Sequence, residues 1–213
     1  IVDATANLKV AARRIAFGKW LNVGQTCVAP DYLLVDTRVH DELLGLIKEE
    51  VRRMFGEHPL DNENYGHIVN AKHFARVRGL IDPDKVVLGS TARESSLKIE
   101  PTILDGVTPD DAVMQEEIFG PILPVLTFES LDEAEAFITD RPTPLALYVF
   151  SQDRAAQQRF VRYVPFGGGC VNDTIMHLAT SHMGFGGMGA SGMGQYHGRE
   201  SFDTFSHKKS IVN

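Results

Sequence analysis

A cysteine in a short loop is the first candidate for chemistry. Residues 22–32 read NVGQTCVAPDY and place Cys27 directly after a Gly-Gln-Thr turn. A thiolate is a strong nucleophile, but a free thiol titrates near ~8.5, so its environment must lower the pKa. A tight turn that presents backbone amides to the sulfur would do this and could also hold an oxyanion. The loop alone leaves the alternative open, because free cysteine is also a common small buried residue.

A second candidate is the segment QEEIFGP at residues 115–121, where two carboxylates precede an apolar pair and a Gly-Pro break. Glu117 could accept hydrogen bonds from sugar hydroxyls, and Phe119 could offer a flat face to a ring. The alternative is a solvated loop before a strand. The segment by itself does not decide between them.

Several other motifs predict no chemistry. Residues 187–192, GMGASG, fit G-x-G-x-x-G, but no strand leads into them from a βαβ unit, so we reject a dinucleotide-binding fingerprint. The eight histidines form no H-E-x-x-H or similar ligand set, so no metal site is expected. Cys170 lies inside the short apolar stretch GCV and is predicted to serve packing.

The composition restricts the class of protein. The chain has 213 residues, a formal net charge of -7 and 43% hydrophobic residues. An acidic balance disfavours nucleic acid and anionic membrane surfaces as partners. No apolar run is long enough to span a bilayer. Two distant cysteines make no disulfide framework, so we expect a reducing, cytoplasmic setting.

Helical and strand patterns alternate along the chain. This order predicts an α/β fold with a mostly parallel sheet and flanking helices, in which ligands bind at the carboxyl ends of the strands. Strands are expected at residues 32–35, 86–88, 99–104, 122–127, 145–151 and 169–171, and helices at 7–20, 39–55, 71–80, 131–138 and 154–161. In the first helix the apolar face is predicted to carry Ile15 and Trp20, with Lys19 elsewhere.

The C-terminal part differs in character from the rest. The glycine-rich loop 184–194 leads into QYHGRESFDTF and then into the β-branched, basic tail KKSIV. The tail has little of its own chain left to pack against. We therefore expect a C-terminal helix and an edge strand for oligomerisation over residues 195–213, offered to a partner chain.

Taken together, these motifs resemble the aldehyde dehydrogenase family. NVGQTCVAPDY resembles its nucleophile loop and EEIFGP its cofactor-ribose motif. PLALYVFS and the series VND, FGG, SGMGQYHG and SFDTFSH are similar to the class 3 branch, which includes fatty and coniferyl aldehyde dehydrogenases. The matches follow the family order over essentially the whole chain.

The resemblance implies an aldehyde as substrate, NAD or NADP as cofactor and a homodimer as the assembly. Cys27 would attack the aldehyde, and the resulting thiohemiacetal would become a thioester that water hydrolyses. Glu117 matches the residue that holds the nicotinamide ribose, and Phe119 the aromatic residue near the nicotinamide. Thr26 and Phe185 match positions at the substrate end of the site.

The resemblance also has departures. The family's cofactor-binding domain, its oxyanion asparagine and its general-base glutamate precede the part that this chain matches. Gly184 stands where the family usually has proline. We therefore expect residues 1–194 to be the catalytic domain of a longer enzyme, without the N-terminal cofactor-binding domain, and the chain alone to be inactive.

Two alternatives from other functional classes remain. A cysteine-dependent esterase or hydrolase would need a histidine directed at Cys27, and none lies near it in the sequence. A non-catalytic oligomerisation module would need only the C-terminal strand and would leave Cys27 inert.

Overall fold

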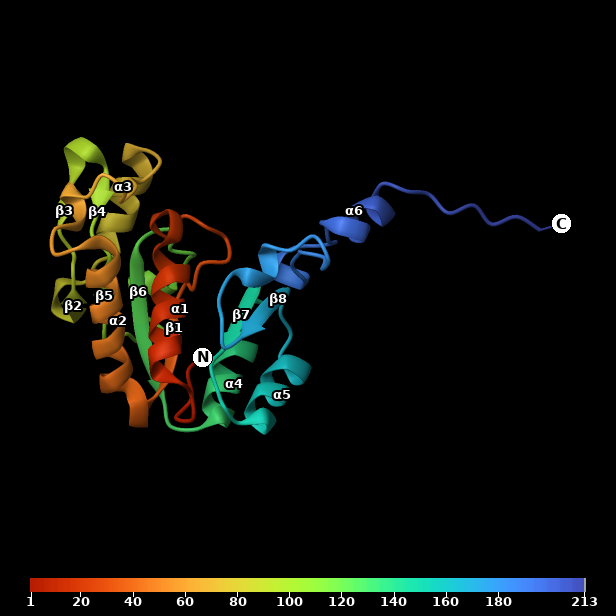
Figure 1. Ribbon diagram of the computed structural model, residues 1–213, viewed down its shortest axis with the longest axis horizontal. Helices are drawn as coiled ribbons and strands as arrows, with labels where there is room; N and C mark the ends of the chain where they lie inside the picture. Colours follow the sequence, from red (N-terminus) through yellow and green to blue (C-terminus); the bar gives the residue numbers. More distant parts are fainter. Residues whose placement is uncertain (213) are drawn as a thin grey trace.

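The first helix forms where its sequence predicts. In the computed structural model, which describes residues 1–212, α1 spans Leu8–Trp20 (Figure 1). The side chain of Asn7 caps its start by accepting the N–H of Val10 at 3.2 Å. Its apolar face packs against α2, His40–Phe55, whose buried residues Leu43 and Ile47 recur at helical spacing. This helix pair covers one face of the main sheet.

The main sheet contains four strands. Strands β1, β6 and β5 pair in parallel, and β2 joins β5 in antiparallel orientation, which gives the order β1-β6-β5-β2. The expected α/β fold with a mostly parallel sheet is therefore confirmed. These strands span Leu33–Asp36 (β1), Val86–Leu88 (β2), Thr102–Leu104 (β5) and Ile122–Phe128 (β6).

Smaller strand pairs flank this sheet. The parallel strands β7 and β8 form a second sheet, beside the helices α4 and α5, and β3 and β4 form a short antiparallel pair. The strand bounds are Ala92–Arg93 (β3), Lys98–Ile99 (β4), Ala146–Val149 (β7) and Gly168–Val171 (β8). The other helices are Ala71–Gly79 (α3), Leu131–Thr139 (α4), Arg154–Tyr163 (α5) and Gly198–Thr204 (α6).

One expected strand is divided. Residues 99–104 form the end of β4 and all of β5, separated by Glu100 and Pro101. Pro101 has no N–H to donate to a ladder, so the chain changes partner there. β4 pairs with β3, whereas β5 pairs with β6.

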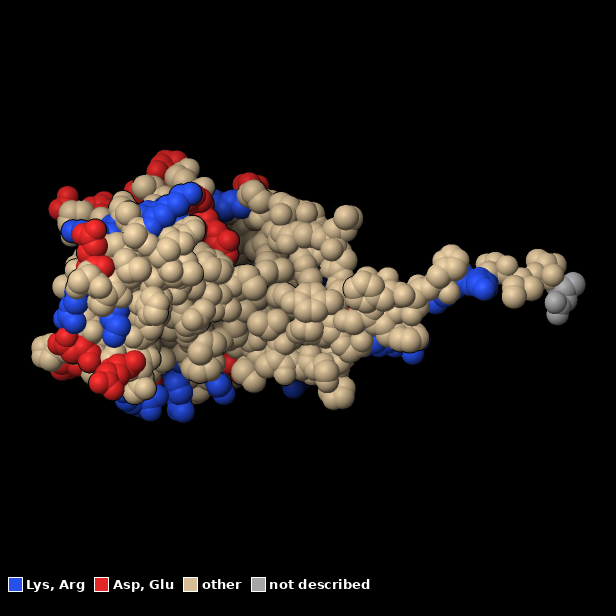
Figure 2. All heavy atoms as spheres, turned by 90° about the horizontal axis from the view of Figure 1, so that it is seen from above, with Lys and Arg blue, Asp and Glu red and all other residues tan. Residues whose placement is uncertain are grey.

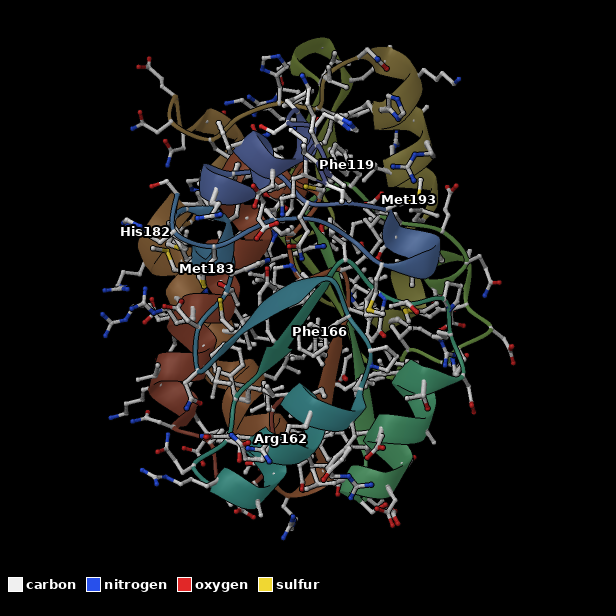
Figure 3. The ribbon with its side chains drawn as sticks, turned by 90° about the vertical axis from the view of Figure 1, so that its right-hand side faces the viewer. Phe119, Arg162, Phe166, His182, Met183 and Met193 are labelled. Carbon is white, nitrogen blue, oxygen red and sulfur yellow. The ribbon has the colours of Figure 1, made fainter. Side chains whose placement is uncertain are left out.

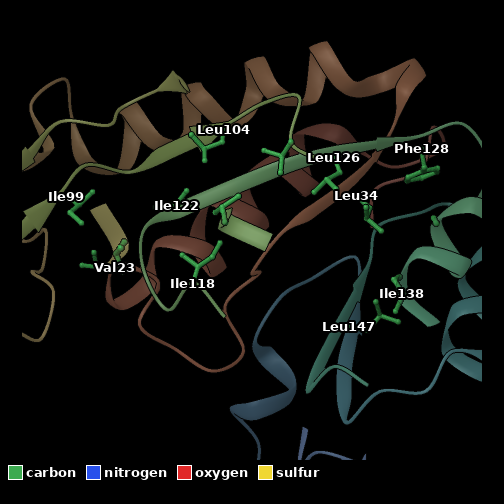
Figure 4. Packing of buried hydrophobic residues seen from close by; sticks show 14 of the residues in the cluster. Val23, Leu34, Ile99, Leu104, Ile118, Ile122, Leu126, Phe128, Ile138 and Leu147 are labelled. Atoms are coloured by element: carbon green, nitrogen blue, oxygen red, sulfur yellow. The ribbon is translucent and has the colours of Figure 1, made fainter. Parts of the chain in front are cut away.

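The core lies on both faces of β6. Side chains along a strand alternate between faces, and Leu123 and Val125 point toward α1 and α2. Ile122 and Leu126 belong to the other cluster, with Leu34 of β1 and residues of α3, α4 and α5 (Figure 4). Full burial of each such side chain contributes about 1.5–3 kcal/mol.

The first residues connect the two sheets. Val2 forms parallel bridges with both Val35, in β1, and Phe150, directly after β7. Its amide donates to Leu34 at 2.9 Å, and the amide of Asp3 donates to Phe150 at 3.1 Å. This short segment therefore lies between β1 of the main sheet and the end of β7 of the second sheet, and it holds the two sheets together.

The C-terminal segment extends away from the rest of the chain (Figures 1 and 2). The expected C-terminal helix is present as α6, but residues 206–212 form no strand within this chain. Phe205 and Val212 are 91% and 97% exposed. The oligomerisation strand therefore stays a prediction about an assembly. Over residues 1–212, no helix has both the length and the apolar character needed to cross a membrane.

Candidate active site

Two loops that are far apart in the sequence meet at the site. The indole Nε1 of Trp20 donates to the carbonyl of Pro121 at 2.9 Å, and the amide of Ile118 donates to the carboxylate of Asp31 at 3.0 Å. Between these contacts, Gly24 lies so close to Gly120 that an added Cβ would be 2.1 Å from its carbonyl oxygen. The Cys27 loop, residues 22–32, and the QEEIFGP segment are thus fixed against each other.

The backbone before Cys27 has an unusual conformation. Asn22, Val23 and Gly24 have φ values of 52°, 59° and 73°, which place three successive residues in the left-handed region. Such conformations cost free energy for residues other than glycine and occur often at functional sites. Gln25 stabilises the turn, because its Nε2 donates to the carbonyl of His67 at 3.0 Å and its Oε1 accepts the amide of Val69 at 2.9 Å.

This turn presents Cys27 to solvent as a free thiol. Cys27 is therefore not the small buried residue that the alternative expected, and its reactivity stays a prediction. Among residues 1–212, its backbone N–H has no hydrogen-bond acceptor, so that amide is available to an oxyanion beside the sulfur. Thr26 is half-buried, and its carbonyl accepts the amide of Ala29 at 3.0 Å, which closes the loop.

A pocket of about 600 Å³ opens beside the sulfur. Its lining includes Cys27 and Glu117, together with Asp31, Tyr148 and Ser191. A volume of this size suits part of a small-molecule or cofactor site. The structure therefore brings together the thiol and the carboxylate that the sequence singled out, although 90 positions separate them.

The charged side chains around Glu117 differ in how far they are buried. Lys19 is only 1% exposed, and burial lowers its pKa from 10.5 to about 8, against the opposing charges of Asp31 and Glu117. Burial raises the pKa of Asp31, and Lys19 opposes that shift. Partial burial also raises the pKa of Glu117, and the charge of Asp31 adds to it. Asp31 and Glu117 thus both act electrostatically on the buried ammonium group of Lys19.

The buried position of Lys19 corrects the expectation that it lies off the apolar face of α1. The helical spacing alone could have revealed it, since Lys19 follows Ile15 by one turn. A cation on such a face needs a carboxylate partner, and those partners come from other segments of the chain.

Arg76 of α3 is a further residue that the sequence did not reveal. Its Nη2 donates to the carbonyl of Ile118 at 2.5 Å, and its Nη1 donates to the carbonyl of Glu117 at 3.3 Å and to the carboxylate of Glu116 at 3.0 Å. These bonds hold the backbone on both sides of the Glu117–Ile118 peptide. Nothing in the spacing of α3 linked it to that segment.

The two aromatic candidates occupy different surroundings. Phe119 has φ 48° and is 41% exposed; Figure 3 shows it in the upper part of the view, with Phe166 and Arg162 below it. Phe185 is 7% exposed and packs against Val28, the residue after Cys27. Neither aromatic side chain nor Thr26 lines the pocket itself. The roles predicted for these three residues stay predictions.

The second sheet contacts the Cys27 loop through Tyr148. Tyr148 of β7 donates its hydroxyl hydrogen bond to the carbonyl of Val28 at 2.6 Å. On β8, Cys170 packs beside Tyr148, and its Sγ lies 3.7 Å from Nδ1 of His177. Burial raises the pKa of the Cys170 thiol. The histidine that contacts a thiol therefore contacts Cys170, which does not favour a hydrolase built on Cys27.

The GMGASG segment and the possible metal ligands can also be located in the structure. Gly189–Ser191 forms a 3₁₀ turn beside the pocket and follows no strand, unlike a dinucleotide-binding fingerprint. Within residues 1–212, no group of three or more histidine, cysteine or acidic side chains is arranged to hold a metal ion.

Comparison with known proteins places this geometry in context. The family model described as the aldehyde dehydrogenase family matches residues 1–211. The chain is 55% identical over 214 residues to the 4,4'-diaponeurosporen-aldehyde dehydrogenase of Staphylococcus aureus. This match covers 100% of this chain and 47% of that protein. The chain is 48% identical over 211 residues to the dimeric NADP-preferring aldehyde dehydrogenase of Rattus norvegicus, covering 99% of this chain and 47% of that one.

A solved structure shows the same fold. The substrate-bound state of Staphylococcus aureus AldH matches with a TM-score of 0.95 and 52% identity, over 100% of this chain and 48% of that chain. The chain thus spans about half the length of the curated relatives and of the solved structure that it matches.

Proposed function

Because the chain belongs to the aldehyde dehydrogenase family, we propose that it is the catalytic half of an NAD(P)-dependent enzyme that oxidises an aldehyde to a carboxylic acid. In this proposal residues 1–194 form the nucleophile domain, and residues 195–213 form a C-terminal helix and an oligomerisation strand. The observation that carries it is the exposed thiol of Cys27 in one pocket with Glu117.

The chemistry follows from the atoms around that pocket. The Cys27 thiolate attacks the carbonyl carbon, a C–S bond forms, and the carbonyl electrons move to the oxygen, which the Cys27 amide holds. Bound NAD or NADP supplies the hydride acceptor. After the carbon has lost its hydride, the C–O double bond reforms and Cys27 carries a thioester. Water then adds to the thioester, and breaking of the C–S bond releases the acid and the thiolate.

The residues that face a cofactor are also part of the proposal. Glu117 offers carboxylate oxygens to the hydroxyls of the nicotinamide ribose, and the loop contacts around Ile118 hold it there. Phe119, which is half-exposed beside it, would pack near the nicotinamide. Phe185 would shape the substrate end because it packs against Val28 of the Cys27 loop, and Thr26 would do so as the residue directly before Cys27. The second oxyanion donor and the water-activating base would come from outside this chain.

The assembly is proposed to be a homodimer in a cytoplasmic setting. The extended tail and its exposed apolar residues, Phe205 and Val212 among them, support a partner chain there. A homodimer also agrees with the name of the Rattus norvegicus relative, which is described as dimeric. Both cysteines are free thiols, as expected in a reducing compartment.

The test measures whether the full-length protein oxidises any of a panel of aldehydes. The reduction of NAD or NADP is monitored by the absorbance of the reduced cofactor. Cys27→Ser should lower turnover by about a thousandfold or more, because a hydroxyl is a poor replacement for a thiolate. Cys170→Ser is the matched control at the only other cysteine, and it should keep turnover within about threefold. Near-normal activity of Cys27→Ser would refute the proposed function.

A further inference from the structure

A carboxylate that the chemistry above does not use lies between the two halves of the site. Asp31 follows Cys27 by four residues, and its Oδ1 accepts the amide of Ile118 at 3.0 Å. Ile118 comes directly after Glu117. A single side chain therefore connects the Cys27 loop to the peptide that carries the candidate ribose ligand.

The same peptide segment is held from the opposite direction. Arg76 donates to the carbonyl of Ile118 at 2.5 Å and to that of Glu117 at 3.3 Å. The amide of Ile118 is thus fixed by Asp31 and its carbonyl by Arg76. With both ends of this residue held, the backbone that carries Glu117 has little freedom to move away from Cys27.

The hydrogen bond to the Ile118 amide requires an acceptor at position 31 and does not require a charge. An asparagine oxygen would accept the Ile118 amide equally well and would avoid the cost of a largely buried carboxylate. The charge of Asp31 acts on the buried ammonium group of Lys19, and the charge of Glu117 acts on the same group. Asp31 therefore accepts a hydrogen bond from the segment that carries Glu117, and its charge acts on the same lysine as the charge of Glu117.

We infer that Asp31 is a positioning residue that sets the location of the Glu117 carboxylate relative to the Cys27 sulfur, and with it the fit of the cofactor ribose. This inference rests on the proposed function. Asp31 acts through the Ile118 amide and touches no reacting atom. Its loss should therefore affect the cofactor more than the aldehyde.

The experiment measures KM and kcat for cofactor and aldehyde separately in the full-length enzyme. Asp31→Ala removes the acceptor and should raise the KM for the cofactor about tenfold, the effect of one lost hydrogen bond to a charged group. The KM for the aldehyde should stay within about twofold of the wild-type value. Asp31→Asn keeps the acceptor and should recover most of the cofactor binding.

Two further variants separate positioning from general stability. In a Glu117→Gln background, Asp31→Ala should add little to the cofactor KM, because the group that it positions is already altered. Asp82→Ala is the matched control, since Asp82 also accepts a backbone amide, that of Asp84 at 3.1 Å, but does not line the pocket around Cys27. It should leave both KM values unchanged. If Asp31→Ala does not fold, Asp31→Ser, which is too short to reach Ile118, replaces it.

The outcomes distinguish the inference from the proposed function. A wild-type cofactor KM in Asp31→Ala or Asp31→Ser would overturn the inference and leave the proposed function intact. If Asp31→Ala raised the cofactor KM by the same factor in the wild-type and the Glu117→Gln backgrounds, the inference would also be overturned. A wild-type enzyme that reduces no cofactor with any aldehyde would overturn the proposed function, and this inference with it.

Discussion

The buried ammonium group of Lys19 makes the stability of the protein depend on pH in a specific way. Its pKa in the folded chain is about 8, whereas that of an unfolded lysine is 10.5. Between these values the unfolded chain binds more protons than the folded one. Raising the pH through this interval therefore favours the folded state, because it removes a charge whose burial is unfavourable.

The size of the effect follows from the two pKa values. Each pH unit within the interval contributes about 1.4 kcal/mol to the free energy of unfolding. Between pH ~7.5 and ~9.5 the folded state should gain about 2 kcal/mol from Lys19 alone. In Lys19→Met the charge and this gain are both absent. The difference in unfolding free energy between wild type and variant should therefore shift in favour of the wild type as the pH rises.

Urea denaturation at a series of pH values measures this difference. Trp20 is the chain's single tryptophan and neighbours Lys19 in a buried position, so its fluorescence reports on the same region. Lys72→Met is the matched control, because Lys72 is exposed on α3 and its loss should not change the pH dependence. A difference between wild type and Lys19→Met that stays constant, or falls as pH rises, would refute the buried-cation account.

Three further predictions concern other parts of the chain. Burial lowers the pKa of His40, but its hydrogen bonds to two aspartates at 2.7 and 2.8 Å outweigh this and raise it. The stabilisation that protonated His40 provides should be full below pH ~6.5, and it should be lost as the pH rises through the raised pKa of His40. The melting temperature of the wild type should therefore exceed that of His40→Gln by less at pH ~8 than at pH ~6. Gly24→Ala should destabilise the fold by about 2–4 kcal/mol and lower turnover, because its Cβ would clash with Gly120. Gly45→Ala, where a Cβ meets nothing, should stabilise it by about 0.5–1 kcal/mol in the same denaturation assay. The 213-residue chain alone should show no micromolar binding of NAD by fluorescence titration, and micromolar binding would contradict its assignment as half of the cofactor site.

The sequence predicts the regular elements well where one helical or strand period dominates. α1 and α2 begin and end within a residue or two of the expected bounds, because their apolar positions repeat at helical spacing. The expectation of one strand at 99–104 is wrong because the chain pairs with β3 before Pro101 and with β6 after it. Local strand propensity does not specify which strand a segment pairs with.

The candidate site is predicted only in part for a related reason. Cys27 and Glu117 stand out through residue type and local motif. Asp31 and Arg76 matter through contacts with Ile118, which lies 87 and 42 positions away from them, and no local spacing indicates those contacts. The burial of Lys19 could be inferred from its helical spacing after Ile15, but the carboxylates that act on it could not.

The backbone contact between Gly24 and Gly120 has a consequence for comparing this protein with its relatives. A Cβ at Gly24 would meet the backbone of Gly120, and a Cβ at Gly120 would meet Val77, so neither loop can gain a methyl group at these positions unless its neighbour moves. Grafting the cysteine loop of another enzyme onto this scaffold should succeed only when the facing loop is exchanged with it. Differences in loop length among relatives should accordingly occur as paired changes at these two places.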